Sequence, residues 1–313
     1  MIRALLSTVC VTACASAADG PPPSLSPAKA PSASEAPFTL ADLPDLSSEE
    51  PTLLLERGPL TQGGLTFWKT EPGSEVFLDD QAIPVDGEGH FMAGFGRDHG
   101  VNAELLVVLP DGREVRRPLV IAGRSFPESR ITIQDDTKVN PYSEEDLAQI
   151  AKERALKKQA RDNRSRTSYW RAGFDWPARG RISGVFGSRR ILNGSPRRPH
   201  SGVDVAAPSG TTPMEFQGTD VLAPTSGIVT LAQTDMFFEG GLIFIDHGQG
   251  LESALLHLSR VDVRPGQVVT KGQVVGAVGM TGRATGPHLH WTLNWQGQPL
   301  DPQLVVGPMT PTE

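Results

Sequence analysis

The chain has 313 residues and a formal net charge of −7; 38% of its residues are hydrophobic and 21% are charged. This balance is typical of a globular protein of about two domains, and the acidic charge argues against a nucleic-acid binder, which normally carries a basic face. Because Gly (33) and Pro (27) are abundant and aromatic residues are few, turns and short strands are expected more than long helices.

Residues 1–17 have the features of an export signal. Arg3 supplies a positive charge, and the apolar stretch from Ala4 to Ala13 is too short to span a bilayer. Ala15-Ser16-Ala17 fits an ordinary signal peptidase site, whereas the four residues that end at Cys14 resemble a lipobox, in which Cys14 carries a lipid. We therefore expect an exported protein, either periplasmic or membrane-anchored, and slightly favour the lipoprotein form.

Both cysteines, Cys10 and Cys14, lie in this signal region. The rest of the chain therefore has neither a disulfide nor a thiolate ligand, and any metal site there must use His, Asp or Glu. Residues 18–51 are rich in Pro, Ser and Ala, and we expect them to form a flexible linker.

Residues 52–135 are predicted to form a small β-sandwich domain, because short β-prone segments alternate there with turn signals such as Asp86-Gly87. His90 and His99 stand alone in it, so loop or surface positions are expected for them rather than metal binding. The predicted strands are 65–68, 76–78, 91–94, 103–109 and 115–121.

Residues 136–172 contain the one clear predicted helix, which runs from Ser143 to about Arg166. Ser143 is a suitable N-cap, acidic residues fill the first turn and basic residues follow toward the end, which suits the helix dipole. We interpret this segment as a connecting helix. An alternative, in which its basic end contacts an anionic polymer, stays open.

Residues 173–307 return to short, Gly-interrupted β segments, followed by a tail at 308–313, so a mostly β chain is expected. Two motifs concentrate potential ligands there: His200 and Asp204 form an HxxxD, and His288 and His290 form an HxH. Side chains two apart on a strand share a face, and so do those four apart. Two such edges could bring two histidines and one carboxylate to a metal ion, which is the ligand set of catalytic zinc.

The helical zinc-protease signature HExxH is absent, so a general base must come from elsewhere, and histidine suits the role because its pKa lies near neutral. His257 ends an apolar stretch and is one candidate. His247 closes a predicted strand, and a structural role is favoured for it.

The region from about Gly180 to Leu304 contains a set of motifs in a characteristic order: GRISGVFGSR (180–189), HSGVDVAAPSGT (200–211), IDHG (245–248) and TGRATGPHLHW (281–291). With these motifs it resembles the LytM/lysostaphin-type zinc endopeptidases, a family of peptidoglycan hydrolases. The resemblance implies an antiparallel β-sheet peptidase domain at 173–307. It also implies that His200, Asp204 and His290 bind one zinc ion per chain. His257 and His288 would then be the two catalytic histidines that are not ligands.

An arginine-rich loop precedes His200, and Arg190, Asn193 and Arg198 are the expected substrate-binding residues. Arginine pairs with carboxylates in a fork geometry, and wall peptides carry free carboxylates. Solvent-facing charges are an equally strong interpretation. Thr212–Asp220 is an insertion relative to the family pattern; it is expected either to border the cleft or to be a passive surface loop.

These features predict a zinc endopeptidase that hydrolyses peptide cross-links of peptidoglycan, in particular D-alanyl–diaminopimelate bonds. The expected partners are peptidoglycan and proteins of wall synthesis or division, with no nucleic acid and with membrane contact only through a lipid on Cys14. The alternative is a regulatory binding protein that activates other wall hydrolases, as in relatives that have lost zinc ligands.

Overall fold

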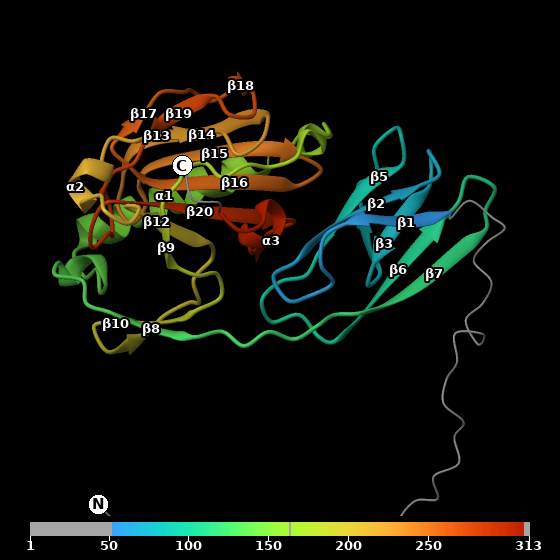
Figure 1. Cartoon of the computed structure of the whole chain (residues 1–313), viewed down its shortest axis with the longest axis horizontal. Coiled ribbons are helices and arrows are strands. Elements are labelled where there is room, and N and C mark those ends of the chain that lie inside the picture. Colours follow the sequence, from blue (N-terminus) through green and yellow to red (C-terminus); the bar gives the residue numbers. More distant parts are fainter. Residues whose placement is uncertain (1–51, 163, 310–313) are drawn as a thin grey trace, which may run out of the picture. The chain divides into compact units, whose positions relative to one another are not determined.

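The computed structural model describes residues 52–162 and 164–309, which belong to one compact unit. These residues are mostly in β-strands, which confirms the predicted fold class (Figure 1). Among them, no helix is both long and apolar enough to cross a membrane. The predicted export signal (1–17), the lipobox at Cys14 and the linker (18–51) lie outside the described residues.

Two small antiparallel sheets form from residues 53–120, with strand orders β1-β2-β5 and β4-β3-β6-β7. Alternation along β6 buries Leu105 and Val107 and exposes Glu104, so each sheet presents one apolar face to a common core. The bounds are β1 Leu53–Arg57, β2 Leu65–Thr70, β3 Glu75–Leu78, β4 Gln81–Ile83, β5 His90–Gly94, β6 Asn102–Val108 and β7 Glu114–Val120.

The five predicted strands in this region are all present, and β1 and β4 are additional. His90 does not have the expected loop or surface position: it lies buried in β5, with its ring nitrogens 3.5 Å from Asp86 Oδ1 and 3.6 Å from Glu56 Oε1. The expectation for His90 is therefore wrong, because a strand with both faces covered buries each of its side chains.

Helix α1, Glu144–Asp162, begins where the sequence predicts, since the Asp146 N–H donates to the capping Ser143 Oγ (3.0 Å). It ends four residues before Arg166. The Ser165 N–H instead donates to Asp246 Oδ2 (2.7 Å), so the chain there is bonded to a strand of the large sheet. Ala160 of α1 packs against the sheet in a small core with Leu242, Phe244 and Ala254.

An eight-stranded sheet dominates the C-terminal half, with the order β18-β14-β15-β16-β20-β12-β9 and with β21 paired to β20. Figure 1 shows β15, β16 and β20 side by side. A second sheet has the order β13-β19-β17. The bounds are β9 Arg181–Gly184, β12 Val203–Ala206, β13 Asp220–Leu222, β14 Gly227–Met236, β15 Gly240–Gly248, β16 Leu251–Leu258, β17 Arg260–Val261, β18 Val268–Val269, β19 Val274–Ala277, β20 His288–Trp295 and β21 Gln298–Leu300.

Alternation divides the side chains of the large sheet between two faces. On β20, Leu289 and Trp291 enter the core of the C-terminal half, together with Val203 and Val205 of β12. We call this the main core. The residues of opposite parity, His288 and His290 among them, face the other way. We call this second face the cleft face, because many of its residues line the cleft described below.

The segment that follows the N-terminal sheets joins the arginine-rich loop. Strand β8, Glu128–Ile131, pairs in parallel with β10, Arg189–Leu192, which pairs in turn with β11, Ser195–Pro196. Four short helices complete the described elements: η2 Asp136–Lys138, η3 Tyr169–Ala172, α2 Pro213–Phe216 and α3 Gln303–Val306.

Apolar contacts join the N-terminal sheets to the large sheet. Leu293 and Trp295 of β20 are buried in the same core as Phe67 and Trp68 of β2. These contacts cross the predicted domain limits, which are 52–135, 136–172 and 173–307. The limits themselves remain predictions.

Candidate metal centre

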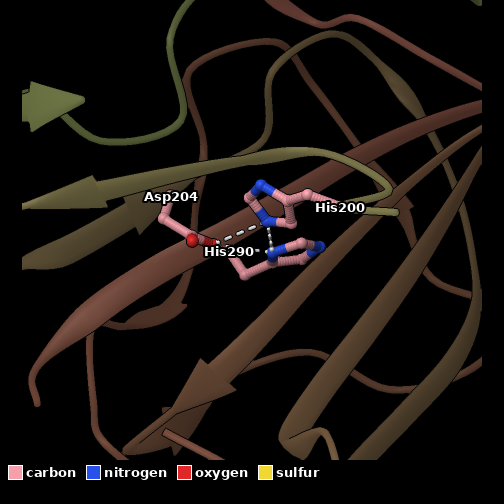
Figure 2. Close-up of side chains that lie close together, drawn as sticks. All are labelled: His200, Asp204 and His290. Atoms are coloured by element: carbon pink, nitrogen blue, oxygen red, sulfur yellow. Dashed lines mark hydrogen bonds and ion pairs between the residues drawn. The ribbon is translucent and has the colours of Figure 1, made fainter. Parts of the chain in front are cut away.

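Three side chains converge on one point of the cleft face (Figure 2). His200 Nε2 lies 3.0 Å from Asp204 Oδ1 and 2.9 Å from His290 Nδ1, and the latter two atoms are 2.8 Å apart. All three residues are buried. The two sequence motifs thus contribute to a single cluster.

Strand register explains this convergence. Asp204 on β12 and His290 on β20 are direct antiparallel partners, so their side chains leave the sheet on the same face. His200 precedes β12 in a loop whose backbone is fixed at two points: its N–H donates to Ser188 O, and its carbonyl accepts from the Gly187 N–H, both at 2.9 Å.

Gly184 on β9 pairs with Asp204 and keeps one side of the cluster open. A Cβ atom on Gly184 would lie 2.2 Å from Asp204 Oδ2 and 3.1 Å from His200 Cε1. No larger residue fits there unless the Asp204 carboxylate moves, so the glycine is a steric requirement of the site.

Hydrogen bonds to outer partners orient each of the three side chains. His200 Nδ1 lies 2.9 Å from Val185 O, and since a carbonyl only accepts, this nitrogen carries the hydrogen and Nε2 presents its lone pair. His290 Nε2 lies 2.8 Å from Thr292 Oγ1. Asp204 Oδ2 accepts from Arg190 Nη2 (2.7 Å), which leaves Oδ1 for the cluster.

The protonation states also suit a cation. Burial works against ionisation of Asp204, yet its close polar contacts with His200 and His290 hold the pKa of its carboxyl well below the ordinary value. Burial lowers the pKa of His290 to about 4. An ionised carboxylate and neutral imidazoles are the forms that bind metals, so these residues fit a divalent cation with nitrogen and oxygen ligands.

His257 and His288 lie beside the cluster. Their ring centroids are 4.8 Å apart, and His288 Nε2 lies 3.8 Å from Asp204 Oδ1. Each Nδ1 lies 2.8 Å from a backbone carbonyl, that of Thr281 for His257 and that of Gly286 for His288. Each Nδ1 therefore carries the hydrogen, and each Nε2 is left with a lone pair that can accept a proton.

His257 has an unusual backbone, with a φ of 64° at the end of β16, where the register with β15 shifts. Such a left-handed conformation in a non-glycine residue costs on the order of 1–3 kcal/mol. It interrupts the alternation, so that Leu256 and His257 both line the cleft, whereas Leu258 returns to the core. The His257 N–H donates to Glu239 O (2.9 Å), which holds this conformation in place.

Burial also determines the protonation state of His257. Its pKa is lowered well below the ordinary value, first by burial and then by the neighbouring His288 and His290. His257 is therefore neutral at physiological pH, the form in which a histidine can act as a base.

A cleft of about 1080 Å³ extends from this cluster along the cleft face of β15, β16 and β20. Its floor is partly apolar, with Phe244 and Leu256, and partly polar, with Thr292 and Asn294. Its lining continues onto the N-terminal sheets and the loop between β5 and β6, which includes His99.

The three residues expected to bind substrate have different surroundings. Arg198 is exposed and lines the cleft. Arg190 also lines the cleft, but its Nη2 donates to Asp204. The Asn193 side chain bonds the backbone of Ile133 in both directions, accepting from its N–H (2.9 Å) and donating to its carbonyl (3.0 Å).

The insertion 212–220 contains helix α2, Pro213–Phe216, which Thr212 caps with a capping box. Phe216 is buried in the main core and Met214 is exposed, and the described lining of the cleft includes no residue of the insertion. The Gly218 N–H donates to Val278 O (2.8 Å), one residue from Gly279, which pairs with His288. A role as a lid stays a prediction.

His247 lies on the face of the sheet opposite the cleft. Nδ1 lies 2.8 Å from Ser226 O and Nε2 lies 2.8 Å from Ser253 Oγ, and burial lowers the pKa of this histidine to about 4. These contacts agree with the structural role expected for it.

Sequence reasoning missed three contributors: Thr292, the contact of Arg190 with Asp204, and the Glu239 carbonyl. Thr292 follows His290 by two residues on β20, so strand periodicity places it on the same face and could have identified it. The other two contacts join segments far apart in the sequence, and no local pattern indicates them.

An antiparallel sheet here presents two histidines and an aspartate at one point, with two further histidines beside them, an arrangement that fits metal-dependent hydrolysis. Residues 198–302 match the model of peptidase family M23. The match confirms the resemblance described from the motifs.

The chain is 38% identical over 130 residues to the peptidoglycan DD-endopeptidase ShyA of Vibrio cholerae, a match covering 41% of this chain and 28% of that protein. It is 39% identical over 128 residues to the DD-carboxypeptidase/endopeptidase Mpg of Neisseria meningitidis, covering 41% of this chain and 27% of that protein. The chain thus matches less than a third of the length of these relatives.

A crystal structure of a Pseudomonas aeruginosa protein assigned to peptidase M23 resembles a larger part of the chain. The TM-score is 0.57 at 28% identity, and the match covers 80% of this chain and 96% of that one. The likeness therefore extends beyond the family M23 domain.

Proposed function

We propose that this chain is a zinc-dependent endopeptidase that hydrolyses peptide cross-links of bacterial peptidoglycan. The observation that carries the proposal is the convergence of His200 Nε2, Asp204 Oδ1 and His290 Nδ1 within 3.0 Å of one another. Two imidazoles and one carboxylate are ligands that suit zinc, and three protein ligands leave a coordination position for water.

Bound zinc supplies Lewis acidity, which lowers the pKa of a water molecule and polarises a carbonyl group. His257 and His288 supply the proton transfers, since each has a free Nε2 and an Nδ1 fixed by a backbone carbonyl. A neutral imidazole of this pair accepts the proton of the attacking water. The imidazolium so formed donates this proton to the leaving amine, either directly or by passing it to the partner histidine.

The substrate proposal is cleavage of directly cross-linked stem peptides at D-alanyl–diaminopimelate bonds. It is supported by similarity to relatives named DD-endopeptidases and by a cleft of about 1080 Å³ next to the cluster. A regulatory binding protein is the alternative function. The presence of all five site residues in one cluster disfavours it.

The test is digestion of purified peptidoglycan by the zinc-loaded chain, with the products identified by mass spectrometry. Conversion of cross-linked dimers to monomers is expected, and it should cease after chelation and in an Asp204→Ala variant. If dimers remain intact, the proposed activity is wrong. If pentaglycine is cleaved and direct cross-links are not, the substrate proposal is wrong and the peptidase proposal survives.

We further propose that the chain is exported and carries a lipid on Cys14, a proposal supported by the sequence of residues 1–17. Proteins of wall synthesis or division would then be accessible as partners. Cys14→Ser should move the protein from the membrane fraction to the soluble fraction. Wild-type protein that is already soluble and begins at Ala18 would contradict the lipid anchor.

A further inference from the structure

Arg283 is a partly buried arginine in the loop just before the HxH motif, and it lines the cleft. Its backbone N–H donates to Phe238 O (2.8 Å), and its guanidinium carbon lies 4.8 Å from the centre of the Phe238 ring. Its other polar contact is a long one, from Nη1 to Lys138 O (3.4 Å). Among the described residues, no carboxylate lies within ion-pair distance of it.

The surroundings of Arg283 lower its pKa. Burial lowers the pKa of Arg283, and the positive charges of Arg190 and Arg197 lower it further. The carboxylate of Glu239, which acts in the opposite direction, is already paired with Lys157.

Of the two neighbouring arginines, only Arg190 has a carboxylate partner among the described residues. Arg190 pairs with Asp204, whose other oxygen faces the metal cluster. Arg197 donates to the neutral side-chain oxygen of Asn140. Among the described residues, Arg283 and Arg197 therefore have no carboxylate partner, as expected of a site that binds an anion.

The position of Arg283 relates this charge to the catalytic chemistry. The loop 281–286 also contains the two carbonyl groups, of Thr281 and Gly286, that fix the Nδ1 atoms of His257 and His288. An anion bound by Arg283 would therefore lie in the cleft that His257 also lines.

The ring contact with Phe238 restricts the guanidinium before any ligand arrives. A planar group held against an aromatic ring loses less conformational freedom when it binds a carboxylate with two parallel hydrogen bonds. A carboxylate is thus the ligand that matches both the charge and the shape of this group.

We propose that Arg283, together with Arg197, binds a free carboxylate of the substrate peptide close to the scissile amide, and so selects peptides in which that group is not amidated. The proposal rests on the proposed peptidase function. It assigns carboxylate binding to the loop before the HxH motif, whereas the sequence indicated this role only for the loop 189–198. In that loop, Arg190 instead orients Asp204.

The kinetic test compares two cross-linked peptide dimers that differ only in this group, one a free acid and one a primary amide. The wild-type chain should cleave the acid with a kcat/KM on the order of 10-fold higher or more, the scale of a hydrogen bond to a charged group. Arg283→Gln should remove most of this preference by slowing cleavage of the acid alone. Arg283→Lys, which retains the charge, should keep part of it.

Two controls accompany these variants. Arg264→Gln, at an exposed position outside the cleft lining, should change neither substrate. Zinc content and thermal unfolding should match the wild type in every variant compared. If Arg283→Gln keeps the full preference for the acid, or if the wild type has none, the carboxylate site is wrong while the peptidase function stands.

A binding experiment tests the carboxylate site independently of peptidase activity. Analogues of both dimers in which a methyleneamine replaces the scissile amide are titrated calorimetrically into the full chain. Tighter binding of the acid than of the amide by the wild type, and equal binding by Arg283→Gln, supports the site even if no peptide is cleaved. Equal binding of both analogues by the wild type overturns it.

Discussion

His288 and His290 lie two residues apart on one strand face, yet their contacts differ. His290 Nδ1 lies 2.8 Å from the Asp204 oxygen that faces the cluster, whereas His288 Nε2 is 3.8 Å from that oxygen. We expect His290→Ala to lose bound metal, because it removes one of three ligands. His288→Ala should keep about one zinc per chain and lose on the order of 10²-fold in turnover, the scale of a positioned acid or base.

Metal analysis of the purified variants by mass spectrometry checks this prediction. His200→Ala and Asp204→Ala should behave like His290→Ala, and His257→Ala should behave like His288→Ala. Loss of metal in His288→Ala with retention in His290→Ala would reverse the assignment. Retention of metal and activity in both would show that the site lies elsewhere.

His247 gives the fold a predictable dependence on pH. Its pKa in the folded state is about 4, compared with an ordinary value of 6.5, because burial disfavours the charged ring. As the pH falls below 6.5, the unfolded state therefore binds a proton before the folded state does. The stability that the neutral ring contributes is complete above 6.5 and is lost as the pH falls to about 4, by on the order of 3 kcal/mol.

Urea unfolding of the wild type and of His247→Gln at neutral and at mildly acidic pH tests this. The variant should be less stable at neutral pH, because it loses the contacts with Ser226 and Ser253. Its stability should nevertheless change less as the pH falls, because glutamine does not titrate. Equal pH dependence in both proteins would assign the effect to other groups.

At this scale, short-range periodicity predicted which residues come together. The spacing within HxH placed His288 and His290 on one face of β20, and the resemblance to a known family indicated which residues are ligands. His200 instead reaches Asp204 from a loop before β12, so strand spacing does not explain that pair. Contacts between distant segments were beyond such reasoning. Nothing in the sequence near Arg190 indicates that it meets Asp204, and nothing near Asn193 indicates that it bonds Ile133.

At the scale of elements, helix α1 reaches the catalytic region through one loop. The buried carboxylate of Glu153 accepts the Phe237 N–H with both oxygens, each at 3.0 Å. Lys157, one turn further along, pairs with Glu239, whose carbonyl accepts the His257 N–H. The helix therefore holds the loop that supports the strained backbone of His257.

We expect Glu153→Ala to lower the free energy of unfolding by about 1–3 kcal/mol, because it leaves the buried Phe237 N–H without its acceptor. Turnover should fall as the loop around Glu239 loosens, while zinc content stays unchanged. Denaturant unfolding, steady-state kinetics and metal analysis measure the three effects. Lys152→Ala, at an exposed position on the same helix, is the matched control. Loss of zinc together with activity would contradict a role through the loop.

The end of β16 shows a change of alternation that the sequence could not predict. Strict alternation from Leu255 would place His257 on the core face, with Leu255 itself. The left-handed residue at His257 resets the alternation, and no residue type in Leu255-Leu256-His257-Leu258 indicates it. In α1, by contrast, Ser143 and the acidic first turn carry a local signal, so its start could be predicted. Its end depends on bonds to the large sheet and could not.

At the scale of the whole described unit, the two β regions were predicted separately, and their shared core was not. Trp295 and Leu293 continue the apolar alternation of β20, and alternation reports which face is buried but not what covers it. The structure shows that Phe67 and Trp68 of β2 belong to the same core. Arg124 also pairs with the buried Asp301 at 2.8 Å, which adds a charged contact between the regions.

This shared core predicts that the two regions unfold together, and Gly94 offers a way to test it. A Cβ atom at Gly94 on β5 would lie 2.8 Å from the Trp295 ring and 2.9 Å from Leu300. Gly94→Val therefore overfills the contact, which costs about 1–3 kcal/mol and should lower the midpoint of unfolding by on the order of 5 °C.

Calorimetry of the wild type should show one cooperative transition. Gly87→Ala, in the same region but with open space around the new atom, should leave the midpoint unchanged. Two separate wild-type transitions, of which Gly94→Val shifts only one, would show that the regions fold independently and that the peptidase region needs no support from the N-terminal sheets.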